Sequence, residues 1–151
     1  MNPLPVGPHR VEAMVKDCLE TARQMLEKNG AFSPWGAVID ASGDRKLVAA
    51  SLEGEPKSAA EQYAIIEQGM ARQHFNGEIV AGAILAEASV PAELKPDYPE
   101  AVRLVVESNT ISRLIFLPFQ RPKPAKEGSE SAWAFGELIG VNVQKTIFAR
   151  S

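Results

Sequence analysis

The chain of 151 residues carries 16 Lys and Arg against 19 Asp and Glu, a formal net charge of −3, and 45% of its residues are hydrophobic. This composition is typical of one globular domain, which can bury a core without disulfides or metals and leaves no room for a second domain. The acidic balance, without a run of basic residues, argues against nucleic-acid binding, because proteins of that class cluster Lys and Arg against phosphates. We expect no membrane partner either, because no stretch approaches the roughly 20 apolar residues of a transmembrane helix.

The first residues predict a cytoplasmic protein, because residues 1–8 hold three prolines and no apolar segment of the kind found in secretory signals. We expect residues 1–8 to form a flexible arm. A single cysteine, Cys18, cannot form an internal disulfide. No cofactor is expected, because phosphate-loop, dinucleotide-binding, zinc-protease and nucleophile-elbow motifs do not occur in the sequence.

Apolar residues recur at steps of three and four from Val11 to Leu26, which predicts an amphipathic helix over about 9–29 that ends at Asn29-Gly30. Cys18 falls on the apolar side of this helix, so we expect a buried and inert thiol and not a nucleophile.

A β-hairpin is predicted next. Two short apolar runs, 35–40 and 46–51, flank the small polar residues 41–44, which suit a tight connection. The segment 40–44 lacks the alternating oxygen ligands of a calcium loop, so we interpret it as a turn.

A second helix is predicted over about 58–75, because Ser58 and Glu61 form a capping-box pattern. Its last turn contains His74, for which a position on an apolar face is a better interpretation than a metal ligand. Strands are then expected over 78–90, 101–108 and 111–119, followed by a last strand within 133–148 that bends at Gly136 or Gly140. The proline-rich stretch 120–131 is expected to form a mobile surface loop.

These elements predict a single α+β domain over 1–151, in the order α-β-β-α-β-β-β, with a mostly antiparallel sheet and two helices packed on one face. Residues 79–86 and 114–119 are apolar on both faces of their strands, so the second face of the sheet must also be covered. A homodimer would cover it. The alternative is that the segment 133–148 or the N-terminal arm folds over it.

The stretch from Phe32 to Gly43, Phe-Ser-Pro-Trp-Gly-Ala-Val-Ile-Asp-Ala-Ser-Gly, resembles a Phe-x-Pro-aromatic-Gly…Asp-x-x-Gly signature in a family of uncharacterised bacterial proteins of unknown function. That resemblance implies no activity. The order of elements is also similar to that of roadblock and profilin-like domains, which implies a dimerising module.

Four residues are the candidate site. Trp35 and Phe119 lie where a strand meets a loop, next to Gly or Pro, so they could anchor an interface or rim a pocket, although core packing also explains them. Glu107 could act as an acid or base with another strand carboxylate, Glu87 or Glu137, but pairing with Arg113 or Arg103 across the hairpin is the simpler interpretation.

No catalytic residue and no metal ligand is therefore assigned from the sequence. The interpretation that we favour is a non-enzymatic, self-associating interaction or regulatory domain. The alternative is a cofactor-free enzyme or a small-ligand binder with a pocket between the sheet and the helices.

Overall fold

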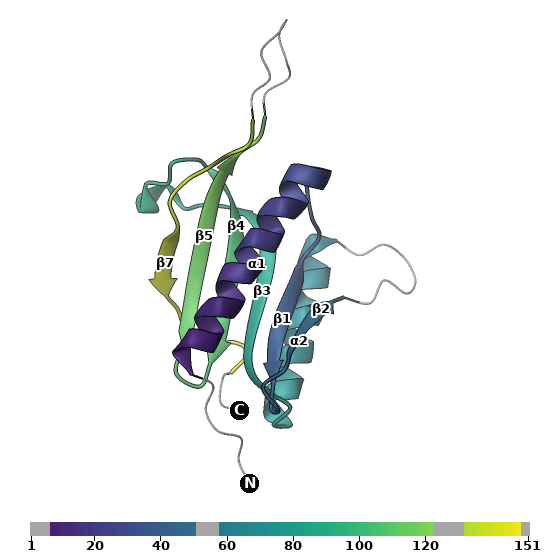
Figure 1. The fold of residues 1–151 in the computed structure, drawn as a ribbon. Helices are drawn as coiled ribbons and strands as arrows, with labels where there is room; N and C mark the ends of the chain where they lie inside the picture. The colour runs from purple at the N-terminus through teal and green to yellow at the C-terminus, as the bar shows by residue number, and fades with distance from the viewer. Residues whose placement is uncertain (1–6, 51–57, 123–131, 149–151) are drawn as a thin grey trace, which may run out of the picture.

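The computed structural model describes residues 7–50, 58–122 and 132–148 and shows one twisted antiparallel sheet with a helix on each side (Figure 1). The helices are α1 (Pro8–Asn29), α2 (Ala59–Phe75) and a short 3-10 helix, η1 (Ala92–Leu94). The strands in chain order are β1 (Trp35–Asp40), β2 (Arg45–Ala49), β3 (Ile79–Ser89), β4 (Glu100–Ser108), β5 (Ser112–Gln120), β6 (Ala134–Phe135) and β7 (Ile139–Asn142).

The sheet has the strand order β2-β1-β3-β4-β5-β6, and β7 also pairs with β5. All of these pairs are antiparallel, which confirms the predicted α+β class and sheet type. The end of the chain differs from the prediction, because two short strands separated by 136–138 replace the single last strand. Residues 1–6 of the predicted arm and 123–131 of the predicted loop lie outside the described residues, and Pro8 belongs to α1.

Local sequence signals account for the ends of both helices. Gly30 adopts a left-handed φ of 79°, and its backbone N–H donates to the carbonyl of Leu26, which closes α1 as predicted. At the start of α2, the side chain of Ser58 accepts a hydrogen bond from the backbone N–H of Glu61 at 3.1 Å, which confirms Ser58 as the N-cap. The carboxylate of Glu61 accepts from the Ser58 hydroxyl at 3.3 Å.

The prediction that both helices pack on one face is wrong. The apolar side of α1 lies against one face of the sheet, with Ala37 and Leu85 in the same core, whereas Ile66 and Met70 of α2 pack on the other face with Val38 and Ile84. The physical reason is that neighbouring residues of β1 and β3 point to opposite faces and are apolar on both, so each face needs its own cover.

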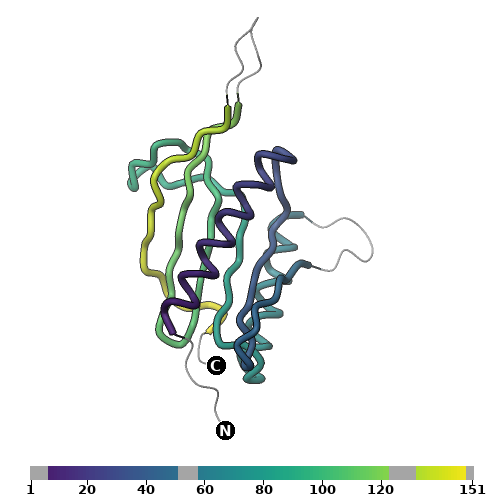
Figure 2. The backbone as a smooth tube through the Cα atoms, viewed as in Figure 1, coloured from purple at the N-terminus to yellow at the C-terminus, as the bar shows by residue number. Residues whose placement is uncertain are grey.

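The second face of the sheet is therefore covered within the chain. Besides α2, Ile147 and Phe148 of the C-terminal segment are buried there, with 1% and 5% of their surfaces exposed. Figure 2 shows this yellow segment leaving β7 and crossing the lower end of the sheet. A homodimer is therefore not needed to cover this face, and part of the segment 133–148, the alternative cover, packs there together with α2.

Two glycines let α2 approach the sheet closely. A Cβ atom at Gly36 would lie 2.4 Å from the carbonyl oxygen of Ala83 and 2.6 Å from the terminal methyl of Met70. A Cβ atom at Gly82, on the neighbouring strand, would lie 3.1 Å from the sulfur of Met70. The side chain of Met70 thus fills a depression that exists because these two positions carry no side chain.

Candidate functional site

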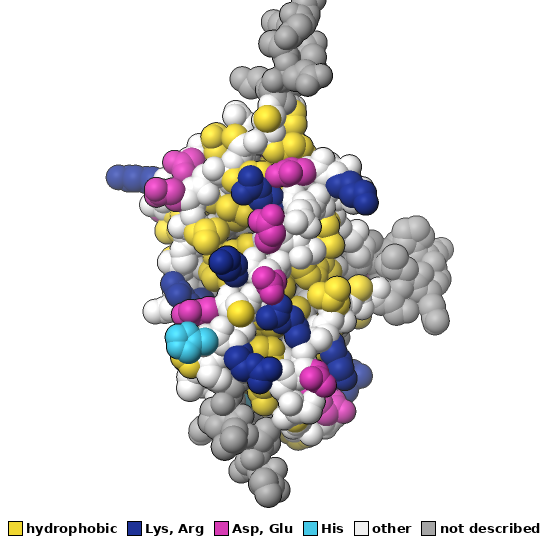
Figure 3. Space-filling model, in the orientation of Figure 1, with side chains coloured by type: hydrophobic (Ala, Val, Ile, Leu, Met, Phe, Trp, Pro, Cys, Tyr) yellow, Lys and Arg dark blue, Asp and Glu magenta, His cyan; other side chains and the backbone are white. Residues whose placement is uncertain are grey.

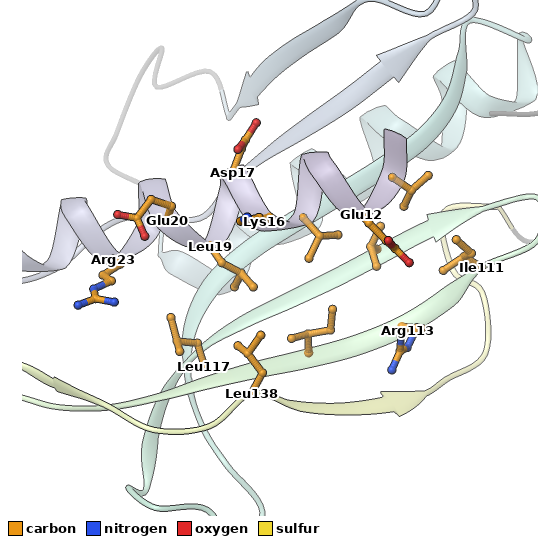
Figure 4. A pocket seen from close by; sticks show the side chains of 14 residues that line it. Glu12, Lys16, Asp17, Leu19, Glu20, Arg23, Ile111, Arg113, Leu117 and Leu138 are labelled. Carbon is orange, nitrogen blue, oxygen red and sulfur yellow. The ribbon is translucent and has the colours of Figure 1, made fainter. Parts of the chain in front are cut away.

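A groove of about 730 Å³ lies between α1 and the outer part of the sheet, and we call it the α1–β5 groove (Figure 4). It exists because α1 crosses the strands diagonally and leaves the α1-facing side of β5 uncovered along part of its length (Figure 1). Aliphatic side chains from α1, β4, the β4–β5 turn, β5 and the β6–β7 connection line it: Val11, Val15, Leu19, Val106, Ile111, Ile115, Leu117 and Leu138.

The outer wall of the groove is low. Gly140 of β7 lies opposite Ile115 of β5, so β7 contributes no side chain at that position. Leu138 stands beside the gap with 57% of its surface exposed. In the space-filling view, hydrophobic atoms are exposed between the charged residues of this face (Figure 3). The α1–β5 groove is therefore an apolar surface that solvent reaches.

Charged side chains form the rim of the α1–β5 groove. Arg23 is ion-paired with Glu27 at 3.1 Å and lies over the ring of Phe135 at 4.5 Å. Arg113 of β5 lies at the other end of the groove, beside Ile111, and makes no hydrogen bond or ion pair with another described residue. The rim thus offers two cations without an ion-pair partner among the described residues, Lys16 on α1 and Arg113 at the end of the apolar surface.

Glu107 lies on the opposite face of the sheet from the groove and is completely buried. One of its carboxylate oxygens accepts hydrogen bonds from the backbone N–H groups of Thr146, Ile147 and Phe148 at 2.9, 2.9 and 3.0 Å, and the other accepts from the Thr146 hydroxyl at 2.9 Å. The predicted pairing with Arg113 is wrong, because Arg113 lies opposite Val106 and so points to the α1 side.

The three strand carboxylates do not form an acid–base pair. Glu87 is opposite Val102, whose side chain is in the α1-side core, whereas Glu107 is on the α2 side, so the sheet separates the two. Glu87 binds Arg121 at 2.7 Å and accepts from the backbone N–H of Phe32 at 3.0 Å. Glu137 is exposed on the β6–β7 connection. Glu107 and Glu87 are therefore structural anchors, of the C-terminal segment and of the α1–β1 loop.

Arg121 makes further contacts around the Glu87 anchor. Besides Glu87, its guanidinium donates to the carbonyl of Gly30, and it lies 5.3 Å from the ring centroid of Phe119 and 5.7 Å from that of Trp133. These contacts join the end of α1, the loop that follows it and the end of β5. Arg103, the other predicted partner of the carboxylates, instead donates to the hydroxyl of Tyr63 at 3.0 Å.

The two aromatic candidates are core residues. Trp35 is 8% exposed and Phe119 is 1% exposed, and both belong to the core under α1. Phe119 packs against Trp133 with ring centroids 5.8 Å apart. Neither side chain is thus available to a partner in this conformation, which agrees with core packing, the other interpretation of these residues.

The remaining candidates also have structural explanations. Cys18 is buried as predicted, and burial raises its pKa to about 11, which disfavours a thiolate at neutral pH. His74 packs against Phe148, with ring centroids 4.0 Å apart and ring planes tilted by 36°. Asp40 closes the β1–β2 turn by accepting from the backbone N–H groups of Ser42 and Asp44 at 2.9 and 3.0 Å, which confirms the turn.

The alternative prediction from the sequence was a pocket between the sheet and the helices, and of the four candidate residues only Arg113 lines the α1–β5 groove; the aliphatic residues that form it were missed. Val15 and Leu19 widen the apolar side of α1 beyond what one strand covers, and this width was the available signal. The part played by Gly140 and Leu138 depends on how β7 is aligned with β5, and no local pattern shows that alignment.

In comparisons with known proteins, no family model matches the chain, no curated protein matches it and no solved structure matches it. Within 7–50, 58–122 and 132–148, no helix is long and apolar enough to span a membrane. In the same ranges, His, Cys, Asp and Glu form no group of three or more that could hold a metal ion.

Proposed function

We propose that the protein binds a small, mainly apolar molecule in the α1–β5 groove. The observation that carries this proposal is the groove itself: about 730 Å³ lined by aliphatic side chains of α1, β4, β5 and the β6–β7 connection. That volume falls within the range of roughly 300–1,000 Å³ that is usual for small-molecule sites, and a mainly apolar lining with polar groups that fix the ligand's orientation is their usual chemistry.

The shape of the α1–β5 groove favours an elongated ligand. The residues of α1 that line it run from Val11 to Arg23, which at roughly 1.5 Å per residue is a length of about 18 Å. Binding would remove apolar surface of Val15, Ile115 and Leu138 from water, and at about 25 cal/mol per Å² this burial supplies the driving force. The role that we propose is binding without catalysis; Glu107 and Glu87 hold the C-terminal segment and the α1–β1 loop, and Glu137 lies apart on the β6–β7 connection.

A titration with decanol tests the proposal, because decanol is apolar, elongated and uncharged. We expect saturable shifts of the backbone amide signals of Val15, Leu19 and Ile115 in nuclear magnetic resonance spectra. Leu138→Asp places a charge in the groove wall and should weaken binding at least tenfold. Leu47→Asp is the matched control, because Leu47 is 75% exposed and lies outside the groove. Unchanged spectra with decanol, or equal effects of the two variants, would refute the proposal.

Self-association is a second proposal, which the partly exposed Leu138 supports, because two copies could bury this side chain against each other's grooves. We also keep as proposals a cytoplasmic location and a relationship to the uncharacterised bacterial proteins and to roadblock and profilin-like domains.

Native mass spectrometry separates the two candidate functions, ligand binding and self-association. A dimer that Leu138→Asp dissociates and Leu47→Asp leaves intact would support self-association, whereas a monomer with or without bound decanol would contradict it.

A further inference from the structure

We infer that the ligand of the α1–β5 groove carries a carboxylate head group, which binds to Arg113. This inference rests on the proposed function and adds the chemical class of the ligand, a molecule with an apolar body and one anionic end. It concerns the end of the groove where β5 begins, the end that Glu12, Ile111 and Arg113 line in Figure 4.

Arg113 lies on the same face of β5 as the aliphatic floor of the groove. Arg113, Ile115 and Leu117 alternate along β5 and share the α1 side of the sheet, so the cation and the aliphatic floor of the groove form one continuous surface. A ligand that lies on Ile115 and Leu117 therefore brings its end to the guanidinium. No other basic residue of β4, β5, β6 or β7 lines the groove.

Gly140 leaves space for the side chain of Arg113 at the outer wall of the groove. A Cβ atom at Gly140 would lie only 2.8 Å from one terminal nitrogen of the guanidinium, which shows that Arg113 extends across Gly140 toward β7. The glycine thus leaves room for the arginine at the low outer wall. Because the guanidinium has no acceptor among the described residues, its donors remain available to a ligand.

The charged residues that line the groove limit the charge of the ligand's head group. Glu12 and Lys16 lie one helical turn apart on α1, both line the groove, and neither has an ion-pair partner within the described ranges. The formal charges of the six charged residues that line the groove cancel, so the preference for an anion comes from Arg113, which shares the face of β5 with the aliphatic floor. A planar carboxylate can accept two parallel hydrogen bonds from one guanidinium, whereas Glu12 would repel a doubly charged group.

Binding of three ligands with the same chain and different ends tests the inference: decanoate, decanol and decylamine, titrated by calorimetry at neutral pH. We expect decanoate to bind about tenfold more tightly than decanol, because a charge-assisted contact at a partly exposed site contributes on that order. Decylamine should bind most weakly. With Arg113→Gln, the affinity for decanoate should fall to that for decanol, while the affinity for decanol should stay within about twofold.

Glu12→Gln should raise the affinity for decanoate, because it removes the one carboxylate at the Arg113 end of the groove that has no ion-pair partner among the described residues. Decanoate should then bind about threefold more tightly. Arg103→Gln is the matched control, because Arg103 bonds Tyr63 on the α2 side of the sheet, and it should leave all three affinities unchanged.

The outcomes separate this inference from the proposed function. If decanol binds but decanoate binds no better, or if Arg113→Gln leaves decanoate binding unchanged, the head-group inference is wrong and the apolar groove stands. If decylamine binds most tightly, the sign of the charge is wrong. If none of the three ligands binds, the proposed function itself is wrong.

Discussion

Removing the carboxylate of Glu107 should release the C-terminal segment from the sheet. Glu107→Ala deletes the acceptor of three consecutive backbone N–H groups, those of residues 146–148, and of the hydroxyl of Thr146. If the segment stayed in place, each unpaired buried donor would cost about 1–3 kcal/mol.

Detachment of the segment limits this cost. It would expose Ile147 and Phe148, at roughly 1.5–3 kcal/mol for each side chain. It would also restore the backbone entropy of three residues, about 1–2 kcal/mol each, which offsets much of that loss. Detachment would also uncover the side chains of the same core, such as Ile79 and Ile84, and no regained entropy offsets this second loss. We therefore expect Glu107→Ala to lower the free energy of unfolding by about 2–4 kcal/mol, within the range of single changes that break a buried polar network.

Urea denaturation followed by circular dichroism measures this loss, and amide hydrogen exchange of residues 146–148 shows where it arises. Glu107→Gln is the closest control, because its amide oxygen can still accept from the backbone, and it should lose less than half as much stability. Glu137→Ala, at an exposed position, should stay within about 0.5 kcal/mol of the original protein. If Glu107→Ala lost less than about 1 kcal/mol and residues 146–148 kept their protection, the anchoring role would be refuted.

Three further predictions concern stability. Gly36→Ala should lower the free energy of unfolding by about 2–4 kcal/mol, because its Cβ would clash with a backbone carbonyl that cannot move alone. Gly82→Ala should lower it less, because the Cβ there comes close only to the flexible end of Met70. Thermal unfolding of both variants checks this order. Arg121→Gln should cost about 1–2 kcal/mol by loosening the end of α1, and hydrogen exchange at Gly30 and Phe32 that stays as slow as before would contradict this. Hydrogen bonds to Asp40, above all the one from the Ser42 hydroxyl, lower the pKa of its carboxyl from 3.8 to about 2. The stability that this carboxylate contributes is therefore complete above about pH 4 and is lost as the pH falls through 2. Asp40→Ala should be less stable than the original protein at pH 6 and differ less from it at pH 2, and a constant difference in urea midpoints between these pH values would contradict this prediction.

Local signals were sufficient for most of the secondary structure. The step pattern that ends at Gly30, the capping box at Ser58 and the turn at 40–44 each depend on neighbouring residues, so the sequence predicted both helices and the first hairpin. The long strands were also predicted, because they are apolar over most of their length. The chain end was not, because the short pairings of β6 and β7 depend on β5 and not on their own residues.

The candidate residues show where local reasoning stops. Glu107 was predicted to act as an acid or base or to pair with an arginine, but its partners are about 40 residues away along the chain, at 146–148. The sequence predicted a pair between Glu107 and either Arg113 or Arg103. Arg113 points to the opposite face, and local reasoning could not show this because a shift of one residue in strand register reverses the face of every side chain. Trp35 and Phe119 stand at strand ends in the sequence, yet the packing of α1 and Trp133 buries them.

The sequence by itself determined the composition class, the two helices, the main strands and the need to cover both faces of the sheet. Only the tertiary structure decided that α1 and α2 take opposite faces, that the C-terminal segment is held by a buried carboxylate, and that α1 leaves the groove beside β5 open. The physical reason is that periodicity and capping act within a few residues, whereas the crossing angle of a helix over a sheet depends on the shapes of side chains brought together from the whole chain.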